Sequence, residues 1–286
     1  MLKELLYKAA RVLTAFTKSS VYKIQFGQYN KDYFETYKPN VDPVVIDRIH
    51  KQFLKDYKPQ ITLFKEKIQS RFKVVIKESF FHTLAAKVQI FPKAGPTNYV
   101  HGLLLYGAIK EYVRTHPQVQ YTIFETGTSK GFSSLCMAKA LADSNVAGRV
   151  VTTDILPVHK PIRWCCAADG KGKQNRLSLL SDYKDLLGYV IFLQGYTDIL
   201  TKQVLLPRIH AAFIDAEHTF KPVLLELTYV SHFQEVDDII VCDDYNIELY
   251  PGVVKAVDQF AKRRKYKKEV FGSAIDTRKY VLLTKQ

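Results

Sequence analysis

The chain has 286 residues, of which 47% are hydrophobic and 24% are charged. This composition excludes a mainly disordered chain and a low-complexity scaffold. No stretch approaches the roughly 20 apolar residues that cross a bilayer, and charges interrupt the apolar pattern of the first residues, unlike a secretory signal. The length fits two average domains, or one large α/β domain with an extension.

The net charge of +14 is concentrated in the first third of the chain. Residues 1–100 carry 18 Lys and Arg against 8 Asp and Glu, and a second basic cluster, KRRKYKK, follows at 262–268. A basic face attracts nucleic acid, anionic lipid or acidic polysaccharide through the same Coulomb attraction. It can also be a solvated surface that keeps the protein soluble, so charge alone names no partner.

The cysteines form neither a C-x-x-C pair nor a zinc-binding spacing. We therefore expect reduced thiols and a cytoplasmic protein. The four are Cys136, Cys165, Cys166 and Cys242.

Residues 1–97 read as a basic, mostly helical N-terminal extension. Residues 1–18 form an amphipathic pattern that could dock on the protein's own core, on a second subunit of a homo-oligomer, or peripherally on an anionic membrane. A helix is predicted over 42–57, and 60–90 is mostly helical by spacing but could contain a strand. The segment FPKAGPTN at 91–98 predicts the junction with the main domain, residues 98–286, whose first helix covers 98–115.

From residue 120 onwards, short apolar runs alternate with helical spans. This alternation indicates βαβ units and a doubly wound, Rossmann-like α/β fold. The last two runs flank a polar turn and predict an antiparallel C-terminal hairpin on a seven-stranded, mainly parallel sheet. The predicted strands are 121–126, 149–154, 189–195, 210–216 and 238–244, with EVFGSAI and KYVLLTK forming the hairpin.

A glycine-rich turn, FETGTSKGFSS at 124–134, is the strongest local signal. Gly127 and Gly131 allow a tight turn between a strand and a helix and a close approach to a ligand. The turn lacks both the dinucleotide fingerprint G-x-G-x-x-G and the Gly-Lys-Ser/Thr of a P-loop. Glu125, which precedes the first glycine of this turn, favours a ligand with an amine or a positive charge, whereas a purely structural turn is the alternative.

Asp154 ends the next predicted strand, where a carboxylate can accept hydrogen bonds from ribose hydroxyls. Such an Asp can also cap a helix. Together with Glu125, the ribose-binding interpretation is the stronger one.

A third signal is a set of carboxylates after two later strands. Asp215 and His218 lie in HAAFIDAEHTF, and Asp243 and Asp244 lie in DIIVCDDYN. Close carboxylates repel one another unless a cation neutralises them, and oxygen ligands suit Mg²⁺. A histidine side chain ordinarily titrates near neutral pH, which makes His218 the natural candidate for a general base. The alternative is that Asp243 or Asp244 caps a loop.

Taken together, these residues resemble the class I S-adenosylmethionine-dependent methyltransferases. Within that superfamily, FIDAEHTF, VCDDYN and PGVVKAVDQF are similar to the macrocin-type sugar O-methyltransferases and related small-molecule methyltransferases. The resemblance covers roughly 98–286. Ser129 departs from it, because many members have a glycine there.

The resemblance implies a role for each matching residue. His218 would take the proton from a sugar hydroxyl, although some relatives use the metal-binding Asp, here Asp215, as the base. Mg²⁺ or another divalent cation would bind Asp215, Asp243 and Asp244. S-adenosylmethionine would contact Glu125, Gly127, Thr128, Gly131, Ser133, Asp154, Gln194, Gly195, Tyr196 and Asp215.

The implied activity is metal-dependent methyl transfer to a hydroxyl of a sugar or glycan-type acceptor, and residues 1–97 would cover the acceptor site or mediate dimerisation. The basic surface suits such an acceptor if it is anionic or lipid-linked. Two alternatives stay open. An RNA methyltransferase would fit the charge, but IDAEH stands where a D-P-P-Y-like motif is expected, and nucleic acid is the less favoured partner. A non-catalytic binding module would not need the acidic residues.

Overall fold

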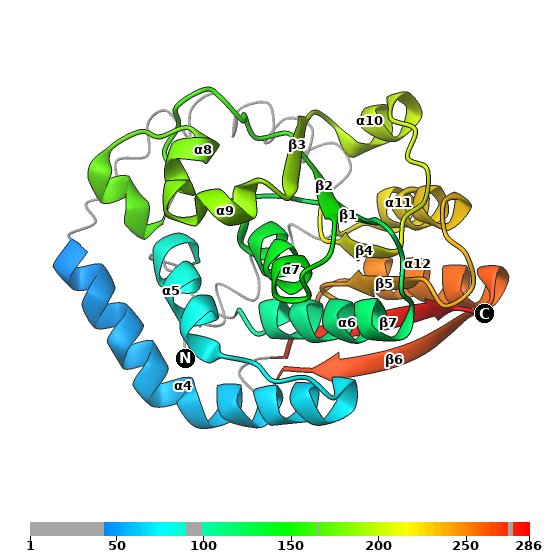
Figure 1. Ribbon diagram of the computed structural model, residues 1–286, viewed down its shortest axis with the longest axis horizontal. Coiled ribbons are helices and arrows are strands. Elements are labelled where there is room, and N and C mark those ends of the chain that lie inside the picture. The colour runs from blue at the N-terminus through cyan, green and yellow to red at the C-terminus, as the bar shows by residue number, and fades with distance from the viewer. Residues whose placement is uncertain (1–42, 90–98, 165, 274–276) are drawn as a thin grey trace.

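A computed structural model describes residues 43–89, 99–164, 166–273 and 277–286. Its centre is a twisted seven-stranded sheet in the order β3-β2-β1-β4-β5-β7-β6 (Figure 1). Strands β1 to β5 run parallel, whereas β7 is antiparallel to β5 and to β6. The predicted doubly wound sheet with a C-terminal hairpin is confirmed. The strands are β1 Tyr121–Thr126, β2 Gly148–Asp154, β3 Val190–Gln194, β4 Ala211–Ile214, β5 Ile239–Cys242, β6 Tyr266–Gly272 and β7 Lys279–Lys285.

The strands follow the apolar runs of the sequence closely. All residues of β4 and β5 are buried, as expected for central strands covered on both faces. The largest difference is β6, which begins at Tyr266 rather than at 269. The basic cluster 262–268 is therefore divided between the end of a helix and an edge strand with two lysines, of which Lys268 is paired with Asp258.

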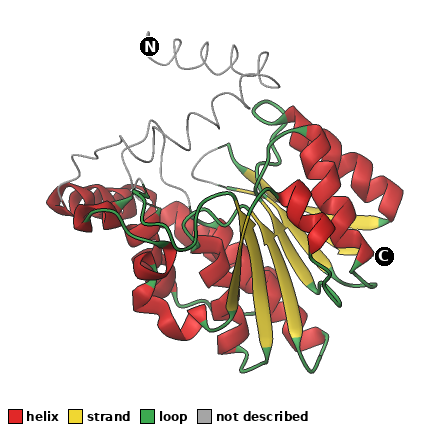
Figure 2. Ribbon diagram, turned by 90° about the horizontal axis from the view of Figure 1, so that it is seen from above, coloured by secondary structure: helices red, strands yellow, loops and turns green. Residues whose placement is uncertain are grey.

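Helices cover both faces of the sheet (Figure 2). One buried apolar cluster includes α4, α5, α6 and α7, and the other includes α11 and α12. Short helical turns connect β2 to β3. The helices are α4 Pro43–Phe72, α5 Glu78–Val88, α6 His101–Thr115, α7 Phe132–Asp143, α8 Arg176–Leu179, α9 Lys184–Leu187, α10 Thr197–Gln203, α11 Phe220–His232 and α12 Pro251–Arg264, with 3-10 turns at Ala167–Lys171 and Ser181–Tyr183.

The helix α4 is longer than the sequence pattern suggests. One helix of 30 residues runs through Pro59, where the prediction separates 42–57 from 60–90. Proline removes one helical hydrogen bond. A buried apolar face with three- and four-residue spacing offsets this cost, and it consists of Ile61, Phe64, Ile68 and Phe72.

The described helices of the N-terminal extension share the core of the main domain. Phe72 stacks on Phe271 of β6 with ring centres 5.8 Å apart. Arg71 bonds Glu111 of α6 and Glu269 of β6. The predicted helix at 1–18 and the whole predicted junction at 91–98 lie outside the described residues. None of the described helices is long and apolar enough to span a membrane.

Candidate active site

The predicted site residues gather at the carboxyl ends of the parallel strands. Strand β1 has β2 on one side and β4 on the other. The strands before and after this point are therefore added to opposite edges of the sheet, although all of them run parallel. Ligands of doubly wound sheets bind in the crevice at such a point. The loops after β1, β2, β4 and β5 therefore define the candidate site.

Glu125 lies near the end of β1 and anchors the helix that follows. Its carboxylate is fully buried and accepts hydrogen bonds from the hydroxyls of Ser133 and Ser134 at the start of α7. Burial raises the pKa of Glu125, and the two hydroxyls oppose this shift. In this structure, Glu125 and Ser133 thus fix α7 to the sheet. The sequence analysis did not single out Ser134, which the structure makes an equal partner.

The glycine turn has the backbone that its sequence predicts. Gly127 and Gly131 have φ values of +88° and +85°, which L-residues rarely adopt. Ser129, at the position of the expected glycine, takes a left-handed φ of +48°. The hydroxyl of Thr128 is buried 2.5 Å from that of Thr152.

Asp154 closes this turn from the neighbouring strand. Its Oδ2 accepts the Ser129 N–H at 2.5 Å, and its Oδ1 accepts the Leu156 N–H at 2.7 Å. The Gly195 N–H donates to the Asp154 carbonyl at 2.8 Å. The carboxylate predicted to hold a ribose is therefore positioned by backbone groups of two loops.

The remaining residues predicted to lie near adenine follow β3. The Gln194 Oε1 accepts the Val158 N–H at 3.3 Å, which joins β3 to the loop after β2. Tyr196 is 56% exposed, so its ring is available to a ligand.

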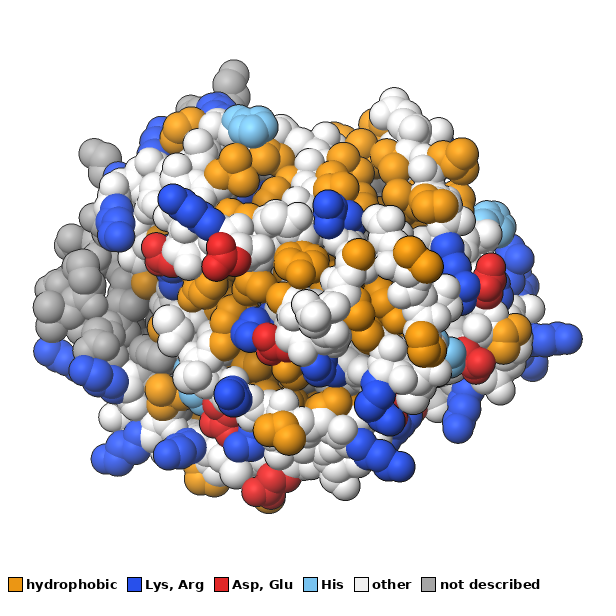
Figure 3. Space-filling view, viewed as in Figure 1, with side chains coloured by type: hydrophobic (Ala, Val, Ile, Leu, Met, Phe, Trp, Pro, Cys, Tyr) orange, Lys and Arg blue, Asp and Glu red, His pale blue; other side chains and the backbone are white. Residues whose placement is uncertain are grey.

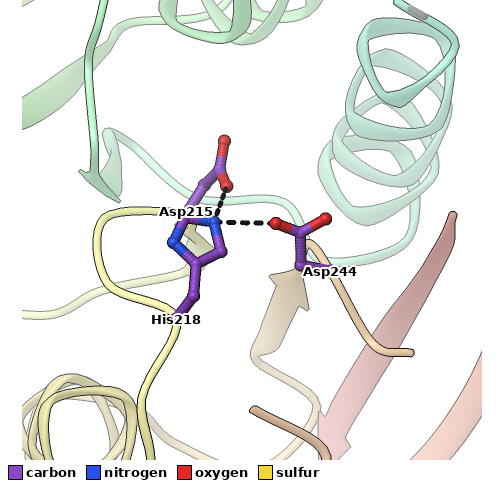
Figure 4. A group of neighbouring side chains, drawn as sticks. All are labelled: Asp215, His218 and Asp244. Atoms are coloured by element: carbon purple, nitrogen blue, oxygen red, sulfur yellow. Dashed lines mark ion pairs between the residues drawn. The ribbon is translucent and has the colours of Figure 1, made fainter. Parts of the chain in front are cut away.

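Two carboxylates and an imidazole converge after β4 and β5 (Figure 4). The His218 Nε2 lies 2.7 Å from the Asp244 Oδ2 and 3.8 Å from the Asp215 Oδ1. Asp244 has a left-handed φ of +54°, a conformation that Asp tolerates. The structure thus brings together three of the four residues predicted here.

Asp243 lies beside this group with a different set of contacts. Its Oδ1 accepts the backbone N–H of Asp244 at 2.6 Å, and its Oδ2 lies 3.7 Å from the Arg278 Nη1. Burial and the charge of Asp244 raise the pKa of Asp243 above its ordinary value. Burial and the charges of Asp243 and Asp244 raise the pKa of Asp215 well above its ordinary value. The carboxylates thus lie in a place where negative charge is costly.

The donor set fits a divalent cation. One ligand atom each from Asp215, His218 and Asp244 lies within 4.8 Å of the others. Two carboxylates suit Mg²⁺ or Mn²⁺, and an imidazole is compatible with the transition metals. Asp243 is not in this group; its place as a third carboxylate ligand stays a prediction.

Sequence reasoning missed Arg278 and Glu226. Arg278 lies before β7, and no local motif marks it. Glu226 is buried on α11, where its Oε2 accepts the Thr126 hydroxyl at 3.0 Å behind the glycine turn. Burial raises its pKa to about 8. An acidic residue on the apolar face of a predicted helix was the available signal.

Comparison with known proteins agrees with this geometry. Residues 124–245 match the family model of a methyltransferase domain. No curated protein sequence matches the chain.

Solved structures share the fold at low identity. Cofactor-bound Rv0187 from MTB is 13% identical with a TM-score of 0.51, over 71% of this chain and 87% of that one. The O-methyltransferase from Bacillus cereus in complex with SAH is 16% identical with a TM-score of 0.50, over 79% and 100%. TomG from Streptomyces achromogenes, an O-methyltransferase in complex with SAM, is 15% identical with a TM-score of 0.50, over 74% and 92%.

The sheet order, the site and these matches define a protein with the class I methyltransferase fold. Residues 124–245, from the end of β1 to the residues after β5, form the segment that matches the model of a methyltransferase domain. The glycine turn, Asp154 and the group of Asp215, His218 and Asp244 all lie within it.

Proposed function

We propose that the protein is an S-adenosylmethionine-dependent O-methyltransferase that acts on a hydroxyl of a sugar or glycan-type small molecule. One observation carries the proposal: a Cβ on Gly127 would lie 2.4 Å from the Asp215 carbonyl oxygen. The glycine turn is therefore in direct contact with the acidic group, by which we mean Asp215, Asp243 and Asp244 together with His218. Transfer between two bound molecules requires such closeness. The O-methyltransferases named above, which hold SAH or SAM, support the same reading.

The cofactor half of the site is made by the glycine turn and the two strands beside it. S-adenosylmethionine, when bound, supplies a methyl group on a positively charged sulfur. Asp154 would accept hydrogen bonds from the ribose, while Gly127 and Gly131 let the backbone approach closely. Gln194, Gly195 and Tyr196 would border the adenine, and the buried Glu125 would hold α7 in place behind it.

The acceptor half is made by the residues after β4 and β5. His218 would take the hydroxyl proton while the oxygen forms its bond to the methyl group and the carbon–sulfur bond breaks. Asp215 and Asp244 would hold a divalent cation through their carboxylates and without the His218 imidazole, whose ring nitrogen has to stay uncoordinated to act as the base. When bound, the cation orients neighbouring hydroxyls and lowers their pKa. Asp243 would keep Asp244 oriented through its hydrogen bond to the backbone.

Calorimetric titration with S-adenosylhomocysteine tests the cofactor half. We expect saturable binding by the full chain and at least about tenfold weaker binding by Asp154→Ala, because one or more charge-assisted hydrogen bonds are lost. Asp185→Ala serves as the control, because Asp185 is exposed on α9, before the start of β3 and away from the carboxyl ends of the strands. If the folded wild-type chain does not bind, the cofactor assignment is wrong.

Release of S-adenosylhomocysteine in the presence of candidate acceptors tests the acceptor half. Sugars and sugar conjugates with neighbouring hydroxyls are tried first, with Mg²⁺ or with a chelator. We expect acceptor-dependent turnover that falls at least about a hundredfold in His218→Asn, as is common for the loss of a general base. Turnover that survives both this substitution and the chelator would contradict the roles given to His218 and the cation.

A further inference from the structure

The hairpin β6–β7 brings a positively charged side chain to the acidic group. The Arg278 Nη1 lies 3.7 Å from the Asp243 Oδ2, and its Nε lies 3.9 Å from the Asp244 Oδ1. The two Asp side chains are 4% and 10% exposed, whereas that of Arg278 is 31% exposed. The guanidinium therefore approaches nearly buried carboxylates from the solvent side.

The backbone on both sides of Arg278 is tied to the loop after β5. The Tyr245 N–H donates to the Lys279 carbonyl at 2.9 Å. The Asn246 Nδ2 donates to the Thr277 carbonyl at 2.7 Å. These bonds continue the pairing of β7 with β5 and fix where the side chain of Arg278 begins.

From this placement we propose that Arg278 is an internal counter-ion that competes with the divalent cation for the acidic group. The proposal rests on the proposed function. Asp244 is shared, because its Oδ1 faces Arg278 while its Oδ2 belongs to the group with His218 and Asp215. Without a metal, the guanidinium offsets the mutual repulsion of the carboxylates. With a metal, two cations repel each other across one carboxylate.

A positioning residue of this kind sets how tightly the metal binds. Removing the charge of Arg278 leaves the negative charge of the carboxylates less neutralised and so favours binding of any other cation. Replacing Arg278 with another positively charged side chain of similar length keeps it in competition with the metal. The two substitutions therefore have opposite expected effects on metal affinity.

Calorimetric titration of the full chain with Mn²⁺, without cofactor or acceptor, tests the proposal. We expect Arg278→Gln to bind Mn²⁺ about tenfold or more tightly than the wild type, given the strength of charge interactions at this range. Arg278→Lys should stay close to the wild type. Adding Asp244→Asn to Arg278→Gln should remove the gain. Arg71→Gln, which removes a guanidinium bound to Glu111 and Glu269, should change nothing.

Equal, weaker or undetectable Mn²⁺ binding by folded Arg278→Gln would overturn the proposal. Arg278→Ser provides a second neutral variant if the first does not fold. The proposed methyl transfer is judged separately, because S-adenosylhomocysteine binding and acceptor-dependent turnover of the wild type do not depend on the Mn²⁺ titration of the variants.

Discussion

Gly127 shows how one residue joins two halves of the site. Its φ of +88° is costly for an L-residue, and its α-carbon packs against the backbone of Asp215 and Ala216. A rigid backbone cannot move aside as the end of a flexible side chain can. The absence of a side chain at 127 is therefore required both by the turn and by the contact between the loops after β1 and β4.

Gly127→Ala tests this requirement. We expect a loss of about 3 kcal/mol in the free energy of unfolding, from backbone strain and overpacking together, and weaker S-adenosylhomocysteine binding. Gly172→Ala is the matched control. It has the same φ of +88° but no atom within 4 Å of the added Cβ, so only backbone strain of about 1–3 kcal/mol applies, and the loss should be smaller than for Gly127→Ala. Equal losses in denaturant unfolding would show that the contact with Asp215 is unimportant.

At the scale of elements, α11 has a buried acidic side chain, Glu226, that packs against β1. Glu226 is 1% exposed and contacts Thr126, at the end of that strand. Burial raises its pKa from 4.5 to about 8. In the folded protein it therefore holds its proton at pH values where the unfolded chain has lost it.

The sign of the resulting pH dependence follows from proton binding. Between about pH 4.5 and 8 the folded state binds more protons at this position than the unfolded state, so stability falls as pH rises, by up to about 1.4 kcal/mol per unit. Glu226→Gln keeps an acceptor for Thr126 but does not ionise. We expect it to gain stability relative to the wild type as pH rises from about 5.5 to 7.5.

Chemical unfolding at several pH values measures this difference. The exposed Glu66→Gln serves as the control, and its stability relative to the wild type should stay constant with pH. If the stability of Glu226→Gln relative to the wild type is also constant with pH, Glu226 is already ionised in the folded protein at neutral pH.

At the scale of the whole molecule, the helices before the sheet belong to the same core. Phe72 of α4 is fully buried and stacks on Phe271 of β6. Phe64 of α4 contacts Tyr280 of β7 edge to face, with ring centres 6.4 Å apart. Figure 3 shows basic side chains around one face of the molecule, with acidic ones among them. Because the aromatic contacts join α4 to β6 and β7, we expect α4 and the sheet to unfold together, although the sequence pattern predicts residues 1–97 as a separate extension.

Phe72→Ala tests this cooperativity. We expect a loss of about 3–5 kcal/mol, typical of a truncated buried Phe, in one transition seen equally by far- and near-ultraviolet circular dichroism. Leu63→Ala on the same helix removes a side chain that is 62% exposed and should cost no more than about 0.5 kcal/mol. Two separate transitions would instead favour an independently folding extension.

The sequence by itself determined the features that local patterns encode. Alternating apolar runs predicted the strands, because a buried strand needs a short continuous apolar segment. The glycine turn and Asp154 could be identified because strand ends in a parallel sheet meet at one edge. Asp215 and Asp244 were found for the same reason.

Only the tertiary structure decided what depends on contacts between distant segments. Arg278 reaches Asp243 because β7 pairs with β5, and no local pattern encodes that register. The pKa of Glu226 is raised because of where α11 packs, and α4 continues through Pro59 because its apolar face packs against the rest of the core. Burial and long-range pairing are properties of the assembled chain, so they set the charges, the pKa values and the extent of the elements that the sequence located.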